Sequence, residues 1–145
     1  MTAEKKIITA YVAAFTRLSP DNIDDLTALL ADDVIFTDPF NHTVGKAGFA
    51  RIFQHMFETC TDPRFTVSDI AHGDDAHYLR WQMTARLSSW PRSALLIEGM
   101  SEVRIDANGR ISHHIDHWDS ASQLLMILPV IRAIIRPVMR LFRIA

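Results

Sequence analysis

The sequence predicts an α+β domain in which a cone-shaped, curved antiparallel sheet carries the N-terminal helices on its concave face. Before residue 60, apolar residues recur at helical spacing in three segments; between residues 64 and 118 they alternate as strands do. A chain of 145 residues that is 48% hydrophobic can form one domain with a sizeable core. Such a layout encloses an apolar pocket with a few polar groups pointing inward.

The first half of the chain predicts three helices and one short strand. Residues 4–18 carry the apolar face of the first helix: Ile7, Ile8, Tyr11, Val12, Phe15 and Leu18. Ser19 can cap a second helix and Pro20 suits its first position. The apolar face of that helix is expected to comprise Ile23, Leu26, Leu29 and Leu30. Residues 34–37 form a strand and 41–45 a loop. The third helix has Phe49, Ile52, Phe53, Met56 and Phe57 on one side.

The second half predicts four strands and a closing helix. Strands are expected around residues 65–70 and over 77–87, 93–105 and 110–118. The turn at 106–109 contains Asn-Gly, which favours the positive φ angles of a hairpin. Ser120 can cap a helix that runs through Leu128, where Pro129 interrupts it. We therefore divide the chain into a domain, residues 1–128, and a C-terminal basic, apolar extension, residues 129–145.

Composition narrows the class of protein. A net charge of −2 provides no general basic field, so no nucleic-acid partner is expected. The single cysteine, Cys60, cannot form an internal disulfide, and it has no obvious basic partner. The N-terminus makes a poor signal peptide, and no run of 18 uncharged apolar residues exists. We therefore expect a cytoplasmic protein without a cofactor.

The segment 34-VIFTDPF-40 raises the first chemical question. Asp38 ends an apolar strand between Phe36 and Phe40. An aspartate before proline can simply cap a turn. The same carboxylate in an apolar pocket could act as a general base, because poor solvation favours its protonated form. Both interpretations remain open at this stage.

Three segments carry a resemblance to known proteins: 11-YVAAF-15, 26-LTALLADDVIFTDPFN-41 and 102-EVRIDANGRI-111. Together they resemble ketosteroid isomerases. More broadly they are similar to the nuclear transport factor 2-like superfamily, which includes the SnoaL-like polyketide cyclases. The resemblance covers about residues 5–125. It implies the cystatin-like α+β barrel and a homodimer formed through the sheet. Because this superfamily hosts isomerases, cyclases, hydratases and binding modules, it does not fix the reaction.

The resemblance also implies site residues. Asp38 stands where the isomerases place their general base, and Tyr11 where they place a phenol that stabilises an oxyanion. Ser101 stands where the isomerases carry a protonated aspartate, and a hydroxyl is a weaker donor than a carboxylic acid. In SnoaL-like cyclases the last strand carries a His-x-Asp pair, which corresponds here to His114 and Asp116.

Strand alternation separates the residues of the last strand into two faces. His114, Asp116 and Trp118 are expected on one face, and Ile111, His113, Ile115 and His117 on the other. Apolarity favours the isoleucines as the inward face, whereas the resemblance favours the His114 face, which we adopt. A metal site is not expected, because the histidines and acids of residues 113–119 divide between the faces.

These residues predict a protein with a small-molecule pocket. The expected function is that of an isomerase or cyclase that transfers protons on an apolar carbonyl compound. Asp38, His114, Asp116 and Tyr11 would be catalytic, with the carboxylate of Asp116 orienting the imidazole of His114. Ser101 and the walls Trp118, Trp81, Phe40, Phe53 and Met56 would contact the substrate. The alternatives are that Tyr11 belongs to the core, that His114 and Asp116 form a structural pair, and that the pocket only binds a lipid or another hydrophobic ligand.

Residues 124–145 form an unusual tail. Arg132, Arg136 and Arg140 recur every four residues among apolar side chains. No acidic residue follows Asp119, so the tail carries four positive charges. An amphipathic helix of this kind can lie on an anionic membrane. It can also pack on its own domain or on a second subunit, and at this stage we favour that interpretation, with Pro137 kinking or restarting the helix.

Overall fold

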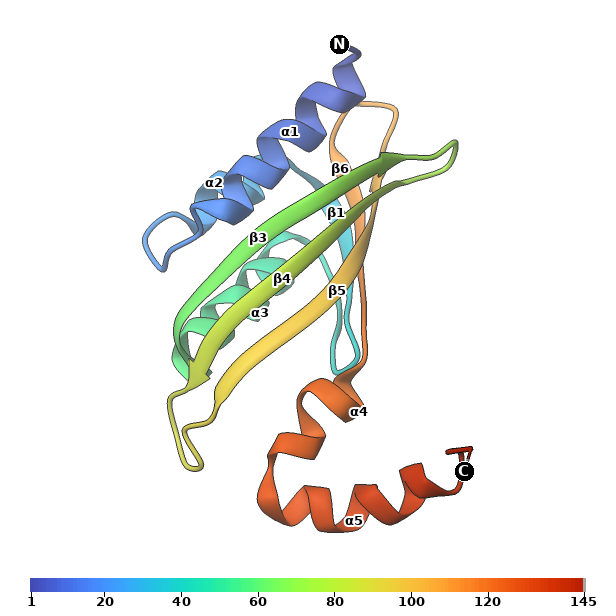
Figure 1. Ribbon diagram of the computed structural model, residues 1–145. Helices are drawn as coiled ribbons and strands as arrows, with labels where there is room; N and C mark the ends of the chain where they lie inside the picture. The colour runs from blue at the N-terminus through green and yellow to red at the C-terminus, as the bar shows by residue number, and fades with distance from the viewer. Residues whose placement is uncertain (145) are drawn as a thin grey trace.

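The computed structural model describes residues 1–144 and confirms the α+β fold class. Six strands form one curved sheet that does not close, and helices cover its concave face (Figure 1). The helices of this face are α1 (Ala3–Thr16), α2 (Ile23–Thr27) and α3 (Lys46–Thr59). The strands are β1 (Leu30–Thr37), β2 (His42–Val44), β3 (Cys60–His72), β4 (His77–Leu87), β5 (Ala94–Ile105) and β6 (Ile111–Trp118).

The strands are ordered β2-β1-β6-β5-β4-β3 across the sheet. The long strands β3 to β6 form a meander of antiparallel neighbours, as expected. Strand β1 pairs with β6 in parallel and with β2 in an antiparallel hairpin. The parallel pair is possible because α3 and the meander separate β1 from β6 in sequence. It brings the end of β1, where Asp38 follows, beside His114 and Asp116 of β6.

A bulge in β6 changes the predicted division of its faces. Ile105 pairs with Ile111, but the next pair is Arg104 with His113, so Ser112 is an extra residue. Ile111 and His114 consequently both point into the core, where Ile111 is fully buried and His114 is 3% exposed. The expectation that Ile111 and His114 lie on opposite faces was wrong, because a one-residue insertion reverses the alternation.

The second helix differs from its prediction at both ends. It begins at Ile23, with Asn22 rather than Ser19 at the N-cap position. The amide side chain of Asn22 accepts from the Ser19 N–H at 2.7 Å and donates to the Arg17 carbonyl at 2.8 Å, which holds the preceding residues in a loop. Leu30, predicted on this helix, begins β1 and pairs with Ile111. Part of the predicted loop 41–45 is the short strand β2.

The core lies between the sheet and helices α1 and α3. Tyr11, Phe36 and Phe49 are its largest fully buried side chains. Phe36 packs edge-to-face on Phe49, with ring centroids 5.5 Å apart. Full burial of an aromatic or aliphatic side chain contributes about 1.5–3 kcal/mol. This cluster therefore anchors both helices and fixes the depth of the cone.

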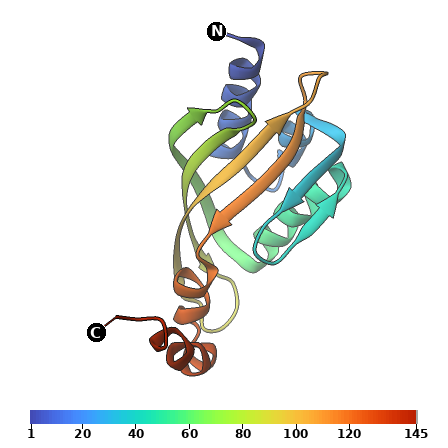
Figure 2. The ribbon, with the colours of Figure 1, turned by 90° about the vertical axis from the view of Figure 1, so that its right-hand side faces the viewer.

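The C-terminal segment leaves the cone. Asp119, not Ser120, caps the short helix α4 (Ser120–Gln123), since its carboxylate accepts from the Ser122 N–H at 3.1 Å. The predicted single helix 120–128 is interrupted, and a 3₁₀ turn, η1 (Leu125–Ile127), follows. Helix α5 (Pro129–Arg140) then runs across one end of the molecule, apart from α1, α2 and α3 (Figures 1 and 2). Among residues 1–144, no helix is both long and apolar enough to span a bilayer.

Candidate functional site

Two cavities lie inside the cone. The inner cavity has a volume of about 40 Å³ and the larger, outer one about 440 Å³. Four side chains line both cavities: Phe53, Phe65, Trp81 and Asp116. The inner cavity exceeds the volume that one water molecule needs, and the larger falls within the range of small-molecule sites. Asp116 therefore stands at the junction of the two spaces.

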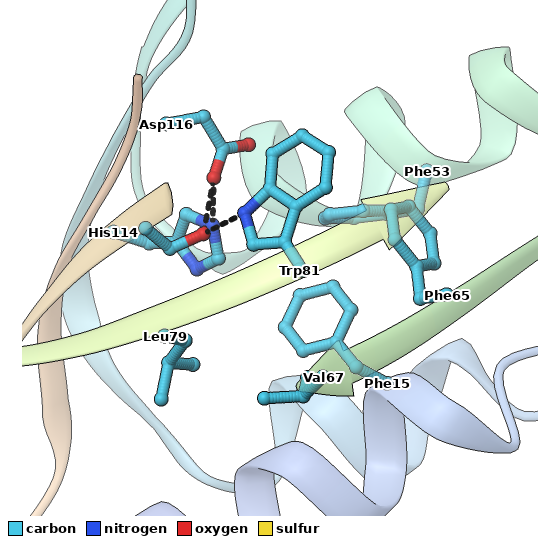
Figure 3. A pocket seen from close by; sticks show the side chains of 9 residues that line it. Phe15, Phe53, Phe65, Val67, Leu79, Trp81, His114 and Asp116 are labelled. Atoms are coloured by element: carbon cyan, nitrogen blue, oxygen red, sulfur yellow. Dashed lines mark hydrogen bonds and ion pairs between the residues drawn. The ribbon is translucent and has the colours of Figure 1, made fainter. Parts of the chain in front are cut away.

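A continuous chain of hydrogen bonds crosses this junction. The Tyr11 hydroxyl lies 2.7 Å from His114 Nδ1, and His114 Nε2 lies 2.7 Å from Asp116 Oδ1. Ser101 Oγ donates to the same Asp116 oxygen at 2.5 Å, and Trp81 Nε1 donates to Ser101 Oγ at 2.8 Å. Figure 3 shows the indole nitrogen of Trp81 directed toward the His114–Asp116 pair. Four elements, α1, β4, β5 and β6, thus contribute to one network.

The network has one assignment of protons in which every donor is used. Trp81 N–H donates only, so Ser101 Oγ accepts from it and directs its own proton to Asp116. Asp116 Oδ1 accepts, so His114 carries its proton on Nε2. The Nδ1 atom of neutral His114 is then an acceptor for the Tyr11 hydroxyl. The imidazole is held at both nitrogens, in one tautomer and one orientation.

Tyr11, the donor to His114 in this network, is fully buried. Its side chain is 0% exposed, and its ring packs edge-to-face on Phe15 at 4.9 Å. Burial, with a smaller contribution from the negative charge of Asp116, raises the pKa of Tyr11 well above its usual value of 10.0. The phenol therefore stays neutral, and its proton is directed at His114. The geometry favours a positioning role for Tyr11 over the expected direct contact with a substrate oxyanion.

Gly99 lets Trp81 reach this network. A Cβ atom at Gly99 would lie 2.6 Å from the Trp81 ring and 2.9 Å from the Trp118 Cβ. Such distances exclude any side chain unless the two tryptophans move. The absence of a side chain on β5 therefore allows two indoles to pack over one backbone position, one of them hydrogen-bonded to Ser101.

The second carboxylate oxygen of Asp116, Oδ2, is free to bind a guest where the two cavities meet. Within residues 1–144, Asp116 Oδ2 has no hydrogen-bond partner, whereas Oδ1 has two. The Asp116 side chain is 16% exposed, and the cavities are its route to solvent. Oδ2 can accept a hydrogen bond or a proton from a guest while Oδ1 keeps the carboxylate in place.

Asp38 also lines the larger cavity, but a turn holds it. Its Oδ1 atom accepts from the backbone N–H groups of Phe40 and Asn41 at 2.8 and 2.7 Å, and the Asn41 amide donates to both oxygens at 3.2 Å. This is the turn alternative of the sequence analysis. Phe40, two residues after Asp38, is 57% exposed, and its ring centroid lies 5.8 Å from that of Trp118.

The structure places all six expected substrate contacts along the cavities. Ser101 lines the inner one, Phe40, Met56 and Trp118 the larger one, and Phe53 and Trp81 both. Ser101 has its one proton directed at Asp116, so its nearest function is to hold that carboxylate. The remaining five present mainly apolar surface. Their contact with a substrate stays a prediction.

Several lining residues were not singled out from the sequence. Phe15, Phe65, Val67 and Leu79 complete the wall of the inner cavity. Their apolar periodicity marked them as core, and nothing in that pattern distinguishes a core position from a cavity wall. Cys60 lines the larger cavity, where burial raises the pKa of its thiol.

The histidines and acids at the end of β6 do not gather into a metal site. His113 forms a hydrogen bond with Ser112, and no metal-binding group of three or more side chains forms within residues 1–144.

Comparison with solved structures supports the fold. A nuclear transport factor 2-like protein from Burkholderia thailandensis superposes with a TM-score of 0.74 at 16% identity, covering 83% of this chain and 94% of that one. A ketosteroid isomerase-like protein from Catenulispora acidiphila, in complex with trimethylamine, gives 0.69 at 17% identity, covering 82% and 89%. A protein from Xanthomonas campestris described as a candidate polyketide cyclase gives 0.68 at 19% identity, covering 83% and 93%.

Sequence comparison identifies the family. The search of curated proteins found no match to this chain. The family model of the SnoaL-like domain matches residues 8–114, which contain α1 from Ile8 onward, the core aromatic residues and β6 as far as His114. With a matching fold and a model that spans most of the domain, this chain belongs to the SnoaL-like domain family.

Proposed function

We propose that this protein is an enzyme that transfers protons on an apolar carbonyl compound, as an isomerase or cyclase does, with Asp116 as its base. One observation carries the proposal: a mostly buried carboxylate stands where two apolar cavities meet, with one oxygen held by two donors and the other free toward the cavities. A base held in this way is oriented before the substrate arrives, and orientation lowers the barrier to proton transfer.

The reaction begins at a carbon next to a carbonyl group. Asp116 Oδ2 takes the proton, and the electron pair of the broken C–H bond moves onto the carbonyl oxygen to form an enolate. In an isomerisation the protonated Asp116 returns its proton to a different carbon. In a cyclisation the enolate carbon instead bonds to a second carbonyl carbon, and the resulting alkoxide takes the proton from Asp116. In both cases Asp116 ends ionised, as it began.

The neighbouring residues act through Asp116 and at the developing oxyanion. Ser101 and His114 hold Oδ1, and Tyr11 holds His114, so these three position the base. The indole N–H of Trp118, which lines the larger cavity, has no acceptor within residues 1–144. That N–H is a donor free to meet the enolate oxygen. Asp38, the base expected from the resemblance, closes the Phe40 turn at the rim in this mechanism.

The walls define the class of substrate. The larger cavity of about 440 Å³ is lined mostly by aromatic, methionine and leucine side chains, and arginine and lysine are absent from its lining. A mid-sized apolar ketone or polyketide-like molecule suits this lining, and a multiply charged metabolite does not. The related protein described as a candidate polyketide cyclase supports the same class.

The test is deuterium exchange into a small apolar ketone. β-Tetralone is incubated with the protein in D₂O, and NMR follows the loss of its α-protons. We expect the wild-type protein to accelerate exchange and Asp116→Asn to lose at least about 100-fold of the acceleration, the usual contribution of a general base. Asp38→Asn is the matched control, because it removes one charge from the same cavity and should retain activity within a few-fold.

The result also separates the enzyme from a second candidate, a non-catalytic binder of a hydrophobic ligand. The apolar cavities with a single free carboxylate oxygen would serve such a binder too. Binding is followed by the fluorescence of Trp81 and Trp118, which lie in the walls. Binding of β-tetralone without accelerated exchange would favour the binder. Loss of exchange in Asp38→Asn, but not in Asp116→Asn, would assign the base to Asp38 instead.

A further inference from the structure

The C-terminal helix α5 has two faces of opposite character and no acidic residue. Arg132, Arg136 and Arg140 follow one another at four-residue spacing and form one stripe. Val130, Ile134 and Val138 are exposed on the opposite side, and Ile131 and Ile135, next to them, are partly buried. Residues after Asp119 contain four arginines and no lysine, aspartate or glutamate, whereas the rest of the chain carries a net charge of −6.

The domain leaves the arginine stripe and most of the apolar side of α5 exposed to solvent. The helix has no buried residue, and Ile134, Leu141 and Phe142 are 68%, 80% and 83% exposed. Within residues 1–144, no arginine of the stripe forms an ion pair. Helix α5 lies beside η1. The expectation that the tail packs on its own domain or on a second subunit stays a prediction. Large apolar side chains exposed together in this way mark an interaction surface.

A second element presents the same chemistry at the same end of the molecule. The hairpin between β4 and β5 reaches the end where α4 and α5 lie, in both views of the ribbon (Figures 1 and 2). Its tip carries Trp90, which is 75% exposed, and Arg92, which is also exposed. An exposed tryptophan beside arginine is typical of protein segments at the headgroup level of a bilayer.

From these observations we propose that α5 and the β4–β5 hairpin dock the protein on an anionic lipid surface. The apolar side of α5 and Trp90 enter the boundary of the acyl chains, and the arginines meet the lipid phosphates. A lipid surface satisfies the apolar and the cationic side chains at once, which the net negative domain does not do.

Docking would also orient the larger cavity. Its lining includes Cys60 at the end of α3, Leu87 at the end of β4, Leu95 at the start of β5 and Leu124 before η1. All four positions lie toward the end of the molecule that carries α5 (Figure 1). An apolar guest could then enter from the bilayer without crossing water. This consequence rests on the proposed function, whereas the docking itself does not.

The test is flotation of the full chain with vesicles of phosphatidylcholine, with and without phosphatidylglycerol. We expect binding to the anionic vesicles, and much weaker binding to the neutral ones. The triple variant Arg132→Gln, Arg136→Gln, Arg140→Gln should bind anionic vesicles roughly 100-fold more weakly, since each basic side chain at such a surface contributes about five-fold. All three arginines are exposed, so the circular dichroism spectrum should be unchanged.

Two further variants make the test decisive. Lys5→Gln, Lys6→Gln, Arg80→Gln removes the same charge from exposed positions away from α5 and should leave vesicle binding within a few-fold. Ile134→Asn, Leu141→Asn should weaken binding while keeping every arginine. Equal binding of both charge variants would overturn the proposal, as would no binding by the wild-type chain. A third outcome would assign α5 to a contact between subunits. In that case the wild-type chain does not bind vesicles and is a dimer in analytical ultracentrifugation, and the variant Ile134→Asn, Leu141→Asn is a monomer.

Discussion

Asp38 and Asp116 line the same cavity and are held by opposite means. Asp38 receives its hydrogen bonds from within three residues of its own position, two of them from backbone N–H groups. Asp116 receives its bonds from side chains on two strands, and these continue to Trp81 and Tyr11. The first arrangement stabilises a turn. The second couples one carboxylate to α1, β4, β5 and β6.

The two carboxylates differ in how far their hydrogen bonds depend on the tertiary fold. The hydrogen bonds of an aspartate in a turn form independently of the rest of the domain, because the donors and the acceptor belong to one short segment. The Asp116 network is complete only when helix α1 is docked on the sheet, since Tyr11 and His114 are 103 residues apart. Buried polar networks of this kind are costly when any member is left without a partner. Perturbing the two sites should therefore have very unequal effects.

The largest effect is expected from His114→Leu. It leaves the buried hydroxyl of Tyr11 without an acceptor and removes one donor from Asp116, so we expect a loss of about 3 kcal/mol in the free energy of unfolding. Urea denaturation measures the loss. Adding Tyr11→Phe to His114→Leu should recover part of it, because removing both partners avoids a buried, unpaired hydroxyl. A double variant whose loss equals the sum of the two single losses would refute the coupling.

Tyr11→Phe alone should have an intermediate effect, about 1–2 kcal/mol at neutral pH, from the unpaired Nδ1 of His114. It should also change the dependence on pH. Burial raises the pKa of Tyr11 in the folded protein, so the folded state retains a proton that the unfolded chain releases above about pH 10. The contribution of Tyr11 to stability is therefore constant below that pH and falls above it, by up to about 1.4 kcal/mol per pH unit.

The control for this pH dependence is Tyr78→Phe. Tyr78 is the second of the two tyrosines and is 37% exposed. The contribution of Tyr11 to the decline above pH 10 should persist in Tyr78→Phe and disappear in Tyr11→Phe. The same decline in both variants would mean that Tyr11 has an ordinary titration and is not held by the network.

The smallest effect is expected on the Asp38 side. Asn41→Ala removes two long hydrogen bonds to Asp38 and keeps both bonds from backbone N–H groups. Because the segment is exposed to water, the expected loss is about 0.5 kcal/mol in urea denaturation, with β-tetralone exchange unchanged. A loss as large as that of His114→Leu would show that the turn is coupled to the cavity and would remove the contrast.

The sequence predicts most of the fold because its periodicity is local. The meander from β3 to β6, helices α1 and α3, and the Asn-Gly turn follow from patterns within ten to fifteen residues. The sequence predicts Leu30 on a helix because Ile23, Leu26 and Leu29 precede it at helical spacing. Its pairing with Ile111 depends on a parallel strand far along the chain. The bulge at Ser112 is also invisible to a pattern that assumes strict alternation.

The site divides in the same way. The resemblance pointed to Tyr11, His114 and Asp116 one by one, and alternation placed the last two on one face. That Tyr11 donates to His114, and that Ser101 holds Asp116, could not be read from the sequence, since both contacts join separate elements. For Asp38, the sequence is equally compatible with a turn and with a general base. The hydrogen bonds that show the turn are visible only in the structure.

Cys60 offers a way to watch the larger cavity directly. It is the single cysteine of the chain and lines that cavity near Met83 and Leu87. Because burial raises the pKa of its thiol, the reactive thiolate is scarce at neutral pH and becomes more abundant in mildly alkaline solution. A thiol-specific reagent should therefore modify one site only, and a guest seated in the cavity should slow that modification. The native chain thus carries its own occupancy reporter, with no engineered label.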